Sequence, residues 1–366
     1  MTNRDRIVNE FQKLVSIDAE SYHEEAMAAY LTERLRVLGL TVSQDAAGNL
    51  FAVLKGTRSG EPLLFSSHMD TVSPGRGKRA VLHPDGTVTS DGTTVLGADD
   101  AAGLAAILEA LTVIREKGLP HPDIEVLFSA AEELYSRGCA AFDFSRIRSR
   151  SAYVLDLTGP IGTAAVAAPS ILSLDISVTG RAAHAGFSPE EGVNALTIAA
   201  RALAALETGR VEPDTTVNFG TIEGGSGKNI VPASVRIRGE IRSLLHEKAL
   251  AQAGAVRERF AAEAEALGGA AQVSVTEELH AYCISEDAPV VRRFRAALAA
   301  LGLGEGKLIT TFGGSDNNHF PLHGIQGIVL ACAMENVHTT AEYTHVSELQ
   351  RSAELTLRLM AIEDEA

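Results

Sequence analysis

The first part of the chain alternates between two patterns of apolar side chains. Residues 4–15 and 23–38 carry them three and four positions apart, which predicts two amphipathic helices, the second ending at Gly39. An Ala- and Leu-rich segment from Asp99 to about Gly118 predicts a longer helix. Short apolar runs predict strands at residues 49–54, 63–67, 124–129 and 152–156. Strands that alternate with helices indicate a sheet layered between helices, the α/β class.

The middle of the chain follows a different pattern. Residues 171–178 alternate between apolar and polar, as a half-buried antiparallel strand does. The order strand–helix–strand–strand–helix–strand predicts a four-stranded antiparallel sheet with two helices on one face. The last part of the chain resumes the first pattern. The sequence therefore predicts an α/β/α sandwich domain built from residues 1–167 and 276–366, interrupted by an inserted α+β domain at 168–275.

Composition narrows the choice of partners and compartment. The 366 residues are enough for two or three domains, and 47 acidic against 32 basic residues give a net charge of -15. This charge argues against nucleic acid or an anionic membrane as a partner. The three cysteines, Cys139, Cys283 and Cys332, show neither metal-binding spacing nor an even framework. Because the N-terminus also lacks an apolar signal region, we expect a cytoplasmic protein.

Five polar residues stand where apolar runs end: His68, Asp99, Glu132, Glu133 and Asp156. In layered α/β sheets ligands bind at the carboxyl ends of the strands, so we expect these side chains to gather on one rim. Divalent ions take carboxylate oxygens and imidazole nitrogens, and one further carboxylate can take a proton from water. The pattern therefore predicts a hydrolase that uses two metal ions.

Seven motifs, in order along essentially the whole chain, resemble those of the M20 family of metallopeptidases, and within it the peptidase-T-like branch of tripeptide aminopeptidases. They are SHMDTV at 67–72, SDGTTVLGADD at 90–100, EE at 132–133, GRAAHAG at 180–186, NIVP at 229–232, GGSD at 313–316 and VHTTAEY at 337–343. The resemblance implies that the sandwich is a catalytic domain of the zinc-aminopeptidase type. It also implies that the inserted domain is a lid and dimerisation domain.

Carried over position by position, the resemblance implies a pair of divalent metal ions in each subunit. Asp99 would bridge the two ions. His68 and Asp156 would complete the ligands of one ion, and Glu133 and His338 those of the other. Zinc is the expected metal, and the same oxygen and nitrogen ligands would accept manganese or cobalt.

The resemblance further assigns the groups that act beside the ions. Glu132 would be the general base, and Asp70 would orient the ring of His68, as carboxylates usually do for imidazole ligands. His184, in the inserted domain, would steady the tetrahedral intermediate; in dimeric relatives this histidine comes from the partner subunit. The remaining positions are expected to bind substrate, the first two through its carboxylate: Asn229, Arg242, Gly314 and Ser315. The peptide between Asp99 and the next residue is expected to be cis.

Several of these positions have a second interpretation. Asp156 and His184 also suit caps or turns, and Arg242 also suits a solvated strand. His338 and His345 compete for one ligand position. A Glu–aromatic pair follows His338 as it does in the family, so we choose His338 and interpret His345 as a surface residue.

The sequence therefore predicts a two-domain, dinuclear metal-dependent hydrolase that releases the N-terminal residue of short peptides, with tripeptides implied by the resemblance. One alternative is the same chemistry on N-acyl amino acids, carboxypeptidase substrates or ureido compounds. Another is a non-catalytic metal- or peptide-binding protein, which a replaced Glu132 or a missing ligand would favour. The segment 134–137 (LYSR) departs from the glycine and small residues of relatives, which bears on the substrate more than on the chemistry. A homodimer through the inserted domain is expected by resemblance.

Overall fold

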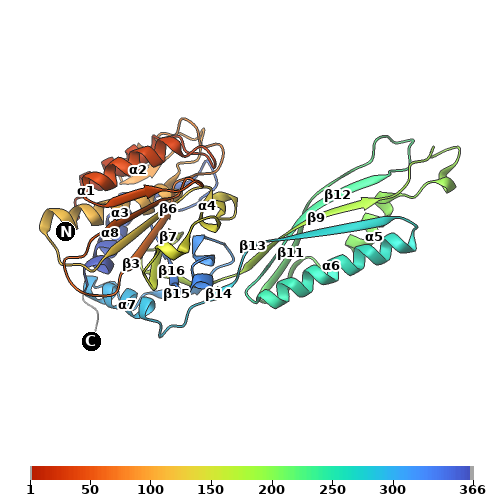
Figure 1. Ribbon diagram of the computed structural model, residues 1–366. Coiled ribbons are helices and arrows are strands. Elements are labelled where there is room, and N and C mark those ends of the chain that lie inside the picture. Colours follow the sequence, from red (N-terminus) through yellow and green to blue (C-terminus); the bar gives the residue numbers. More distant parts are fainter. Residues whose placement is uncertain (1, 363–366) are drawn as a thin grey trace. The chain divides into compact units, whose positions relative to one another are not determined.

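The computed structural model describes residues 2–362 and divides the chain into two compact units. Unit 1 is formed by Met1–Ala167, Cys283–Thr311 and Ser315–Ala366, and unit 2 by Ala168–Tyr282 and Phe312–Gly314. Each unit is coloured along the sequence in Figure 1. In the part of the chain described, no helix has the length and apolar character needed to cross a membrane.

Unit 1 is built on a nine-stranded sheet in the order β1-β2-β6-β3-β7-β16-β8-β14, with β15 paired to β8. At its centre β6, β3, β7 and β16 run parallel, whereas β1 and β2 are antiparallel to their neighbours. β8 runs antiparallel to β16 and parallel to β15. The strands are β1 (Thr41–Gln44), β2 (Leu50–Leu54), β3 (Leu63–His68), β6 (Ile124–Ser129), β7 (Ser151–Leu157), β8 (Thr163–Ala168), β14 (Tyr282–Cys283), β15 (Lys307–Thr310) and β16 (Gln326–Ala331). A separate three-stranded sheet contains β4 (Val81–Leu82), β5 (Thr87–Thr89) and β17 (Tyr343–His345).

The helices of unit 1 cover the central strands, so that β3 and β6 are buried along their whole length. α3 lies against β3 and β7 and packs on α1 and α8 (Figure 1). The helices are α1 (Arg4–Val15), α2 (Glu25–Val37), α3 (Ala98–Lys117), α4 (Arg137–Ala140), α7 (Pro289–Leu301) and α8 (Val346–Ala361), and the 3-10 turns are η1 (Glu132–Leu134), η2 (Phe144–Arg146), η4 (Asp316–Asn318) and η5 (Pro321–His323).

Neighbouring residues of the central strands face opposite layers. Leu64 of β3 packs in a cluster with Phe142 and Phe320, which come from the segments around α4 and η4. The next residue, Phe65, stacks on Tyr153, whose hydroxyl donates to the carbonyl of Val290 in α7. Two apolar layers therefore enclose the sheet, and this confirms the α/β sandwich predicted from the alternation of strands and helices.

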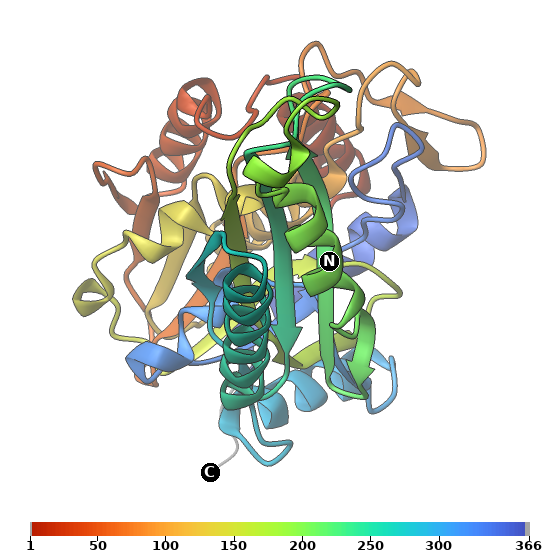
Figure 2. The same cartoon turned by 90° about the vertical axis from the view of Figure 1, so that its right-hand side faces the viewer.

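Unit 2 is a five-stranded antiparallel sheet in the order β10-β11-β12-β9-β13, with α5 and α6 packed on it (Figure 2). Its elements are β9 (Ser170–Thr179), η3 (Pro189–Glu191), α5 (Ala195–Ala204), β10 (Gly209–Glu212), β11 (Thr215–Gly224), β12 (Ser234–Ser243), α6 (His246–Ala266) and β13 (Ala270–Leu279). Alternate residues of β9 are buried in one cluster with the helices, as the period of two predicts.

The prediction of four strands in unit 2 is wrong by one. The missed strand, β10, is four residues long and pairs with β11 over a short register beside a bulge. Its sequence, Gly209-Arg210-Val211-Glu212, holds a single apolar residue and is followed by Pro213, so it carries no alternation to detect. At the other edge of the sheet, β13 stays paired to β9 as far as Leu279, and unit 2 continues to Tyr282.

Candidate metal centre and active site

The carboxyl ends of three adjacent parallel strands carry the predicted ligands of unit 1. His68 is the last residue of β3, Asp156 lies near the end of β7, and Glu133 lies in η1 just after β6. Asp99 is the second residue of the long helix α3, and His338 lies in the loop between β16 and β17. Because β6, β3 and β7 are neighbours, their ends meet at one edge of the sheet.

The structure brings these five residues together as two groups that share Asp99. In the first group, Nε2 of His68 lies 2.9 Å from Oδ1 of Asp99 and 3.9 Å from Oδ1 of Asp156. In the second, Nε2 of His338 lies 3.3 Å from Oδ2 of Asp99 and 2.9 Å from Oε2 of Glu133. Within each group the ligand atoms lie within 4.8 Å of one another. Asp99 therefore presents one oxygen to each group, as a bridging carboxylate does.

The donor chemistry of both groups fits a divalent metal ion. Each combines one imidazole nitrogen with two carboxylates, a set typical of zinc and of manganese or cobalt. The side chains are nearly enclosed, with His338 alone 52% exposed, so the pair of groups opens to solvent on that side. Oε1 of Glu133 is buried without a hydrogen-bond partner, which leaves it available to an ion.

The charges of the two groups also favour the binding of cations. Burial raises the pKa of Asp156 well above its usual value, and it also raises the pKa of Glu133. Burial acts on Asp99 in the same direction, but hydrogen bonds to His338 and His68 hold its pKa below the usual value. Hydrogen bonds to Asp99 and Glu133 raise the pKa of His338 to about 10. Such a concentration of buried carboxylates is stabilised by cations, and a bound ion would replace the proton on the imidazole.

Asp70 is placed to hold several parts of the site at once. Its Oδ1 lies 3.4 Å from Nδ1 of His68 and accepts a hydrogen bond from the backbone N–H of Glu132 at 2.9 Å. Its Oδ2 accepts from the backbone N–H of Glu133 at 3.2 Å and from the hydroxyl of Ser21 at 2.7 Å. Although burial acts to raise the pKa of Asp70, its interaction with the neighbouring ring of His68 and its other partners hold that pKa below the usual value. One buried carboxylate thus fixes an imidazole and the turn that carries the Glu pair.

Glu132 stands beside the two groups without belonging to either. The hydroxyl of Ser136 donates to its Oε1 at 3.1 Å. Burial raises the pKa of Glu132 well above its usual value, and the negative charges of Asp316 and Glu133 add to this. Its turn is bounded by residues with positive φ, namely Ala131 (49°), Tyr135 (63°) and Ser136 (54°). A carboxylate with a raised pKa next to two metal-binding groups is suited to take and return a proton.

Three further acidic residues support the site and were not identified from the sequence. Asp100, joined to Asp99 by a cis peptide as the resemblance implies, accepts from the hydroxyl of Ser67 and from the backbone N–H of His68. Glu342 accepts from the backbone N–H groups of Gly97 at 2.7 Å and Asp99 at 3.0 Å. Glu24 accepts from the N–H of Ala131 at 2.9 Å. Glu342 lies in the same motif as His338, whereas no motif marked Glu24.

The predicted residues of the inserted domain lie in unit 2. Nδ1 of His184 accepts from the backbone N–H groups of Gly186 and Phe187, both at 3.1 Å, which leaves Nε2 as the protonated nitrogen. The segment of His184 is bridged to that of Asn229, whose carbonyl accepts from the N–H of Ala185 at 3.0 Å. Arg242 donates to both carboxylate oxygens of Glu240 and to the carbonyl of Phe312 at 2.8 Å.

The loop with Gly314 and Ser315 is tightly packed. A Cβ at Gly314 would lie 2.1 Å from Cδ1 of Leu279, so a larger residue here would require the side chain of Leu279 to move. Ser315 is buried, belongs to unit 1, and caps η4 by accepting from the N–H of Asn317. His345, interpreted above as a surface residue, caps α8 and lies 2.9 Å from the carbonyl of Asp85.

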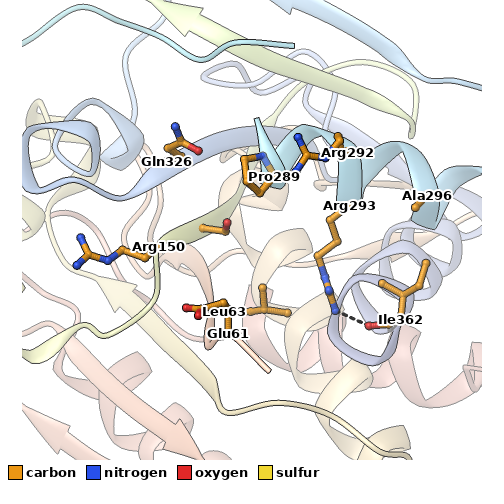
Figure 3. Close-up of a pocket in the computed structure, with 10 residues that line it drawn as sticks. Glu61, Leu63, Arg150, Pro289, Arg292, Arg293, Ala296, Gln326 and Ile362 are labelled. Atoms are coloured by element: carbon orange, nitrogen blue, oxygen red, sulfur yellow. Dashed lines mark hydrogen bonds between the residues drawn. The ribbon is translucent and has the colours of Figure 1, made fainter. Parts of the chain in front are cut away.

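A cavity lies in unit 1 away from the two donor groups (Figure 3). It has a volume of about 540 Å³ and is lined by Leu63, Ser151 and Gln326, the first residues of β3, β7 and β16. It therefore lies at the amino ends of the strands, opposite the two metal-binding groups, and none of the predicted site residues lines it. We do not assign the active site to this cavity.

Comparisons with known proteins agree with the geometry. The model of the M20 peptidase dimerisation domain matches residues 166–267, and the model of peptidase family M28 matches residues 49–187. The aminopeptidase PepT from Bacillus cereus is 40% identical, with a TM-score of 0.92 over 98% of both chains. A tripeptidase from Staphylococcus aureus is 34% identical, with a TM-score of 0.95 over 99% of this chain and 98% of its own. Peptidase T from Escherichia coli is 31% identical over 54% of this chain and 59% of its own.

Proposed function

Because the chain belongs to the M20 family of metallopeptidases, in its peptidase-T-like branch, we propose that it is a metal-dependent aminopeptidase acting on tripeptides. The observation that carries this proposal is the pair of donor groups sharing Asp99, with Glu132 beside them. The likeness to an aminopeptidase and a tripeptidase over nearly the whole chain supports the choice of substrate.

We propose that His68, Asp99 and Asp156 hold one divalent ion and Asp99, Glu133 and His338 the other. Zinc is the metal we expect, because imidazole and carboxylate groups are its usual ligands in hydrolases. When bound, such ions polarise a carbonyl oxygen and make water acidic enough to be deprotonated near neutral pH. Three protein ligands in each group leave room for water and substrate.

In this proposal Glu132 takes a proton from the attacking water and later gives it to the nitrogen of the leaving amine. Its raised pKa suits both transfers, because a group that gains and loses a proton in one cycle works best near the ambient pH. Ser136 orients the carboxylate through its hydroxyl, and Asp70 fixes the backbone N–H of Glu132. Asp70 also lies close enough to Nδ1 of His68 to set the orientation of that ring.

We assign the carbonyl oxygen of the scissile bond to His184, whose protonated Nε2 is a suitable donor. Asn229 and Arg242 are our candidates for the substrate's carboxylate, which a guanidinium binds with two parallel hydrogen bonds. The salt bridge of Arg242 to Glu240 (2.9 Å) would then be exchanged for the substrate or shared with it. Gly314 and Ser315 would act through the backbone of their loop, since the hydroxyl of Ser315 is used in its cap.

We also propose a homodimer formed through unit 2. The match of residues 166–267 to a peptidase dimerisation domain supports it. β10 pairs with β11 only at the start of that strand, so within the described residues Thr221–Gly224 form an exposed edge. An edge of this kind can pair with the same edge of a second copy. Three free cysteines, two of them buried, support a cytoplasmic location.

The test is hydrolysis of di-, tri- and tetrapeptides and an N-acetylated tripeptide by the metal-loaded protein. We expect release of the N-terminal residue from the tripeptide, blocked by acetylation and lost in Glu132→Ala. Glu305→Ala, which removes an exposed carboxylate of the same unit, is the matched control and should keep full activity. Cleavage of the acetylated peptide alone would move the protein to the acylase or carboxypeptidase group. No cleavage of any peptide by a protein with two bound ions would refute the proposed substrate class.

A further inference from the structure

Unit 2 contains a cluster of two histidines and a glutamate, far along the sequence from the candidate ligands of unit 1. His246 begins α6, Glu277 lies in β13, and His280 follows the end of that strand. Their ligand atoms all lie within 4.8 Å of one another. We propose that these three residues form a third metal site in each chain, for zinc or a similar divalent transition-metal ion. This proposal does not depend on the peptidase activity.

The three side chains converge around the carboxylate of Glu277. Nδ1 of His280 lies 2.8 Å from its Oε1, and Nε2 of His246 lies 3.8 Å from its Oε2. The two imidazole rings lie against each other, with their centroids 4.1 Å apart and their planes tilted by 31°. Two imidazole nitrogens and one glutamate oxygen are a donor set that zinc takes in proteins.

A buried hydroxyl fixes the ring of His246. Oγ of Ser170, at the start of β9, lies 3.0 Å from Nδ1 of His246. The same oxygen accepts a hydrogen bond from the backbone N–H of Ala281 at 2.8 Å, and Ser170 is fully buried. When Nδ1–H of His246 donates to this hydroxyl, Nε2 is unprotonated on the side of Glu277 and free to bind an ion. Metal-binding histidines in proteins typically donate through their second nitrogen in this way.

The cluster is also accessible to an ion from solvent. The side chains of His246, His280 and Glu277 are 21%, 31% and 46% exposed. Three protein ligands at a partly open position leave one coordination place for water, so we expect weaker binding than in the enclosed groups of unit 1.

The position of the cluster gives the ion a structural role. Ser170 lies close to Ala168, where the chain enters unit 2, and His280 lies close to Tyr282, where it leaves. An ion there would join the first turn of α6 to the end of β13 at these two crossing points. Because the ion binds only when α6 and the end of β13 are both folded, we expect it to raise the melting temperature of the protein.

The experiment counts ions in the full-length protein. Metal-free protein is dialysed against micromolar zinc, and bound zinc is measured by mass spectrometry for wild type, His246→Ala, His280→Ala and Glu277→Gln. We expect three ions per chain in wild type and two in each variant, with peptidase activity of the variants retained. His23→Ala, which removes an exposed histidine of unit 1, is the matched control and should bind three.

Differential scanning calorimetry gives a second measurement on the same samples. Zinc at this concentration should raise the melting temperature of wild type more than that of His280→Ala. If a histidine variant folds poorly, the same comparison is made with Glu277→Gln. An equal number of bound ions in wild type and in all the folded variants would overturn the proposal. Equal thermal shifts in wild type and the folded variants would remove the structural role.

Discussion

Replacing Asp70 with asparagine keeps the shape of the side chain and removes one acceptor. The carboxylate accepts hydrogen bonds from the N–H groups of Glu132 and Glu133 and from Ser21, and lies 3.4 Å from Nδ1 of His68. An amide has a single oxygen, so its NH2 group must face at least one of these donors. A buried donor left without a partner costs about 1–3 kcal/mol. Losing the partner of a metal-binding histidine typically weakens metal binding by about 10–100-fold.

The unpaired donor destabilises the folded protein with or without metal, and the lost partner of His68 weakens metal binding, so Asp70→Asn should show the two costs in separate assays. Competition with a chelator should give metal binding weaker by about 10–100-fold, which equals about 1.4–2.8 kcal/mol. Thermal unfolding of the metal-free protein should show the cost of the unpaired donor. Asp143→Asn is the control, because Asp143 is exposed and accepts only from its neighbour Ser145. Unchanged metal affinity and unchanged kcat in Asp70→Asn would refute the positioning role of this carboxylate.

Three further predictions concern stability and substrate choice. Tyr135→Gly should raise the free energy of unfolding by about 0.5–1 kcal/mol, as measured by urea unfolding, because Tyr135 has a positive φ of 63° that glycine adopts without strain. Because Tyr135 is exposed next to the Glu pair, the same variant should change the preference for apolar side chains in a panel of peptide substrates. An unchanged preference would show that Tyr135 does not contact the substrate. Gly138→Ala should destabilise the protein strongly, because the new Cβ would lie 2.1 Å from the carbonyl oxygen of Ala130. Gly254→Ala in α6, where no atom lies within 4 Å of the new Cβ, should instead stabilise the protein by about 0.5–1 kcal/mol. Equal melting temperatures of the two variants would contradict this prediction. Burial lowers the pKa of His319 from its usual 6.5 to about 4, so as the pH falls the unfolded chain takes up the proton before the folded protein does. The free energy of unfolding should therefore decrease by up to about 3 kcal/mol between pH 6.5 and pH 4. Urea unfolding at several pH values should show a smaller decrease in His319→Gln, and identical pH profiles would refute this role of His319.

The layered fold could be predicted from local sequence patterns. A strand buried on both faces is apolar at successive positions, whereas a strand buried on one face alternates between apolar and polar residues. Continuous apolar runs marked β3 and β6, and alternation marked β9. β10 left no such signal, since a short edge strand with one apolar residue is held by pairing with β11 rather than by its own pattern. The separation into catalytic and inserted parts came from the change of period along the chain.

For the site, strand ends and motifs indicated which residues to consider, and the structure shows which of them lie together. The sequence paired Asp70 with His68, but its bonds to the Glu pair depend on a turn with positive φ at Ala131, which no local pattern revealed. Glu24 reaches Ala131 across more than a hundred positions of the chain, so no spacing could have identified it. The roles given to Glu132 and to His184 stay predictions, and the segment after Glu133 still has to be tested against substrates.

The hydrogen bonds of Glu342 have a consequence for synthesis on the ribosome. Its carboxylate holds the backbone at Gly97 and Asp99, and its neighbour in sequence His338 completes the second donor group. The first 160 residues thus carry the other four ligands but lack the groups that set the position of the shared one. The ribosome therefore has to synthesise all of unit 2 and most of the segment that follows it before both donor groups can form. On this basis the growing chain can form both donor groups only after residue 342 has been synthesised.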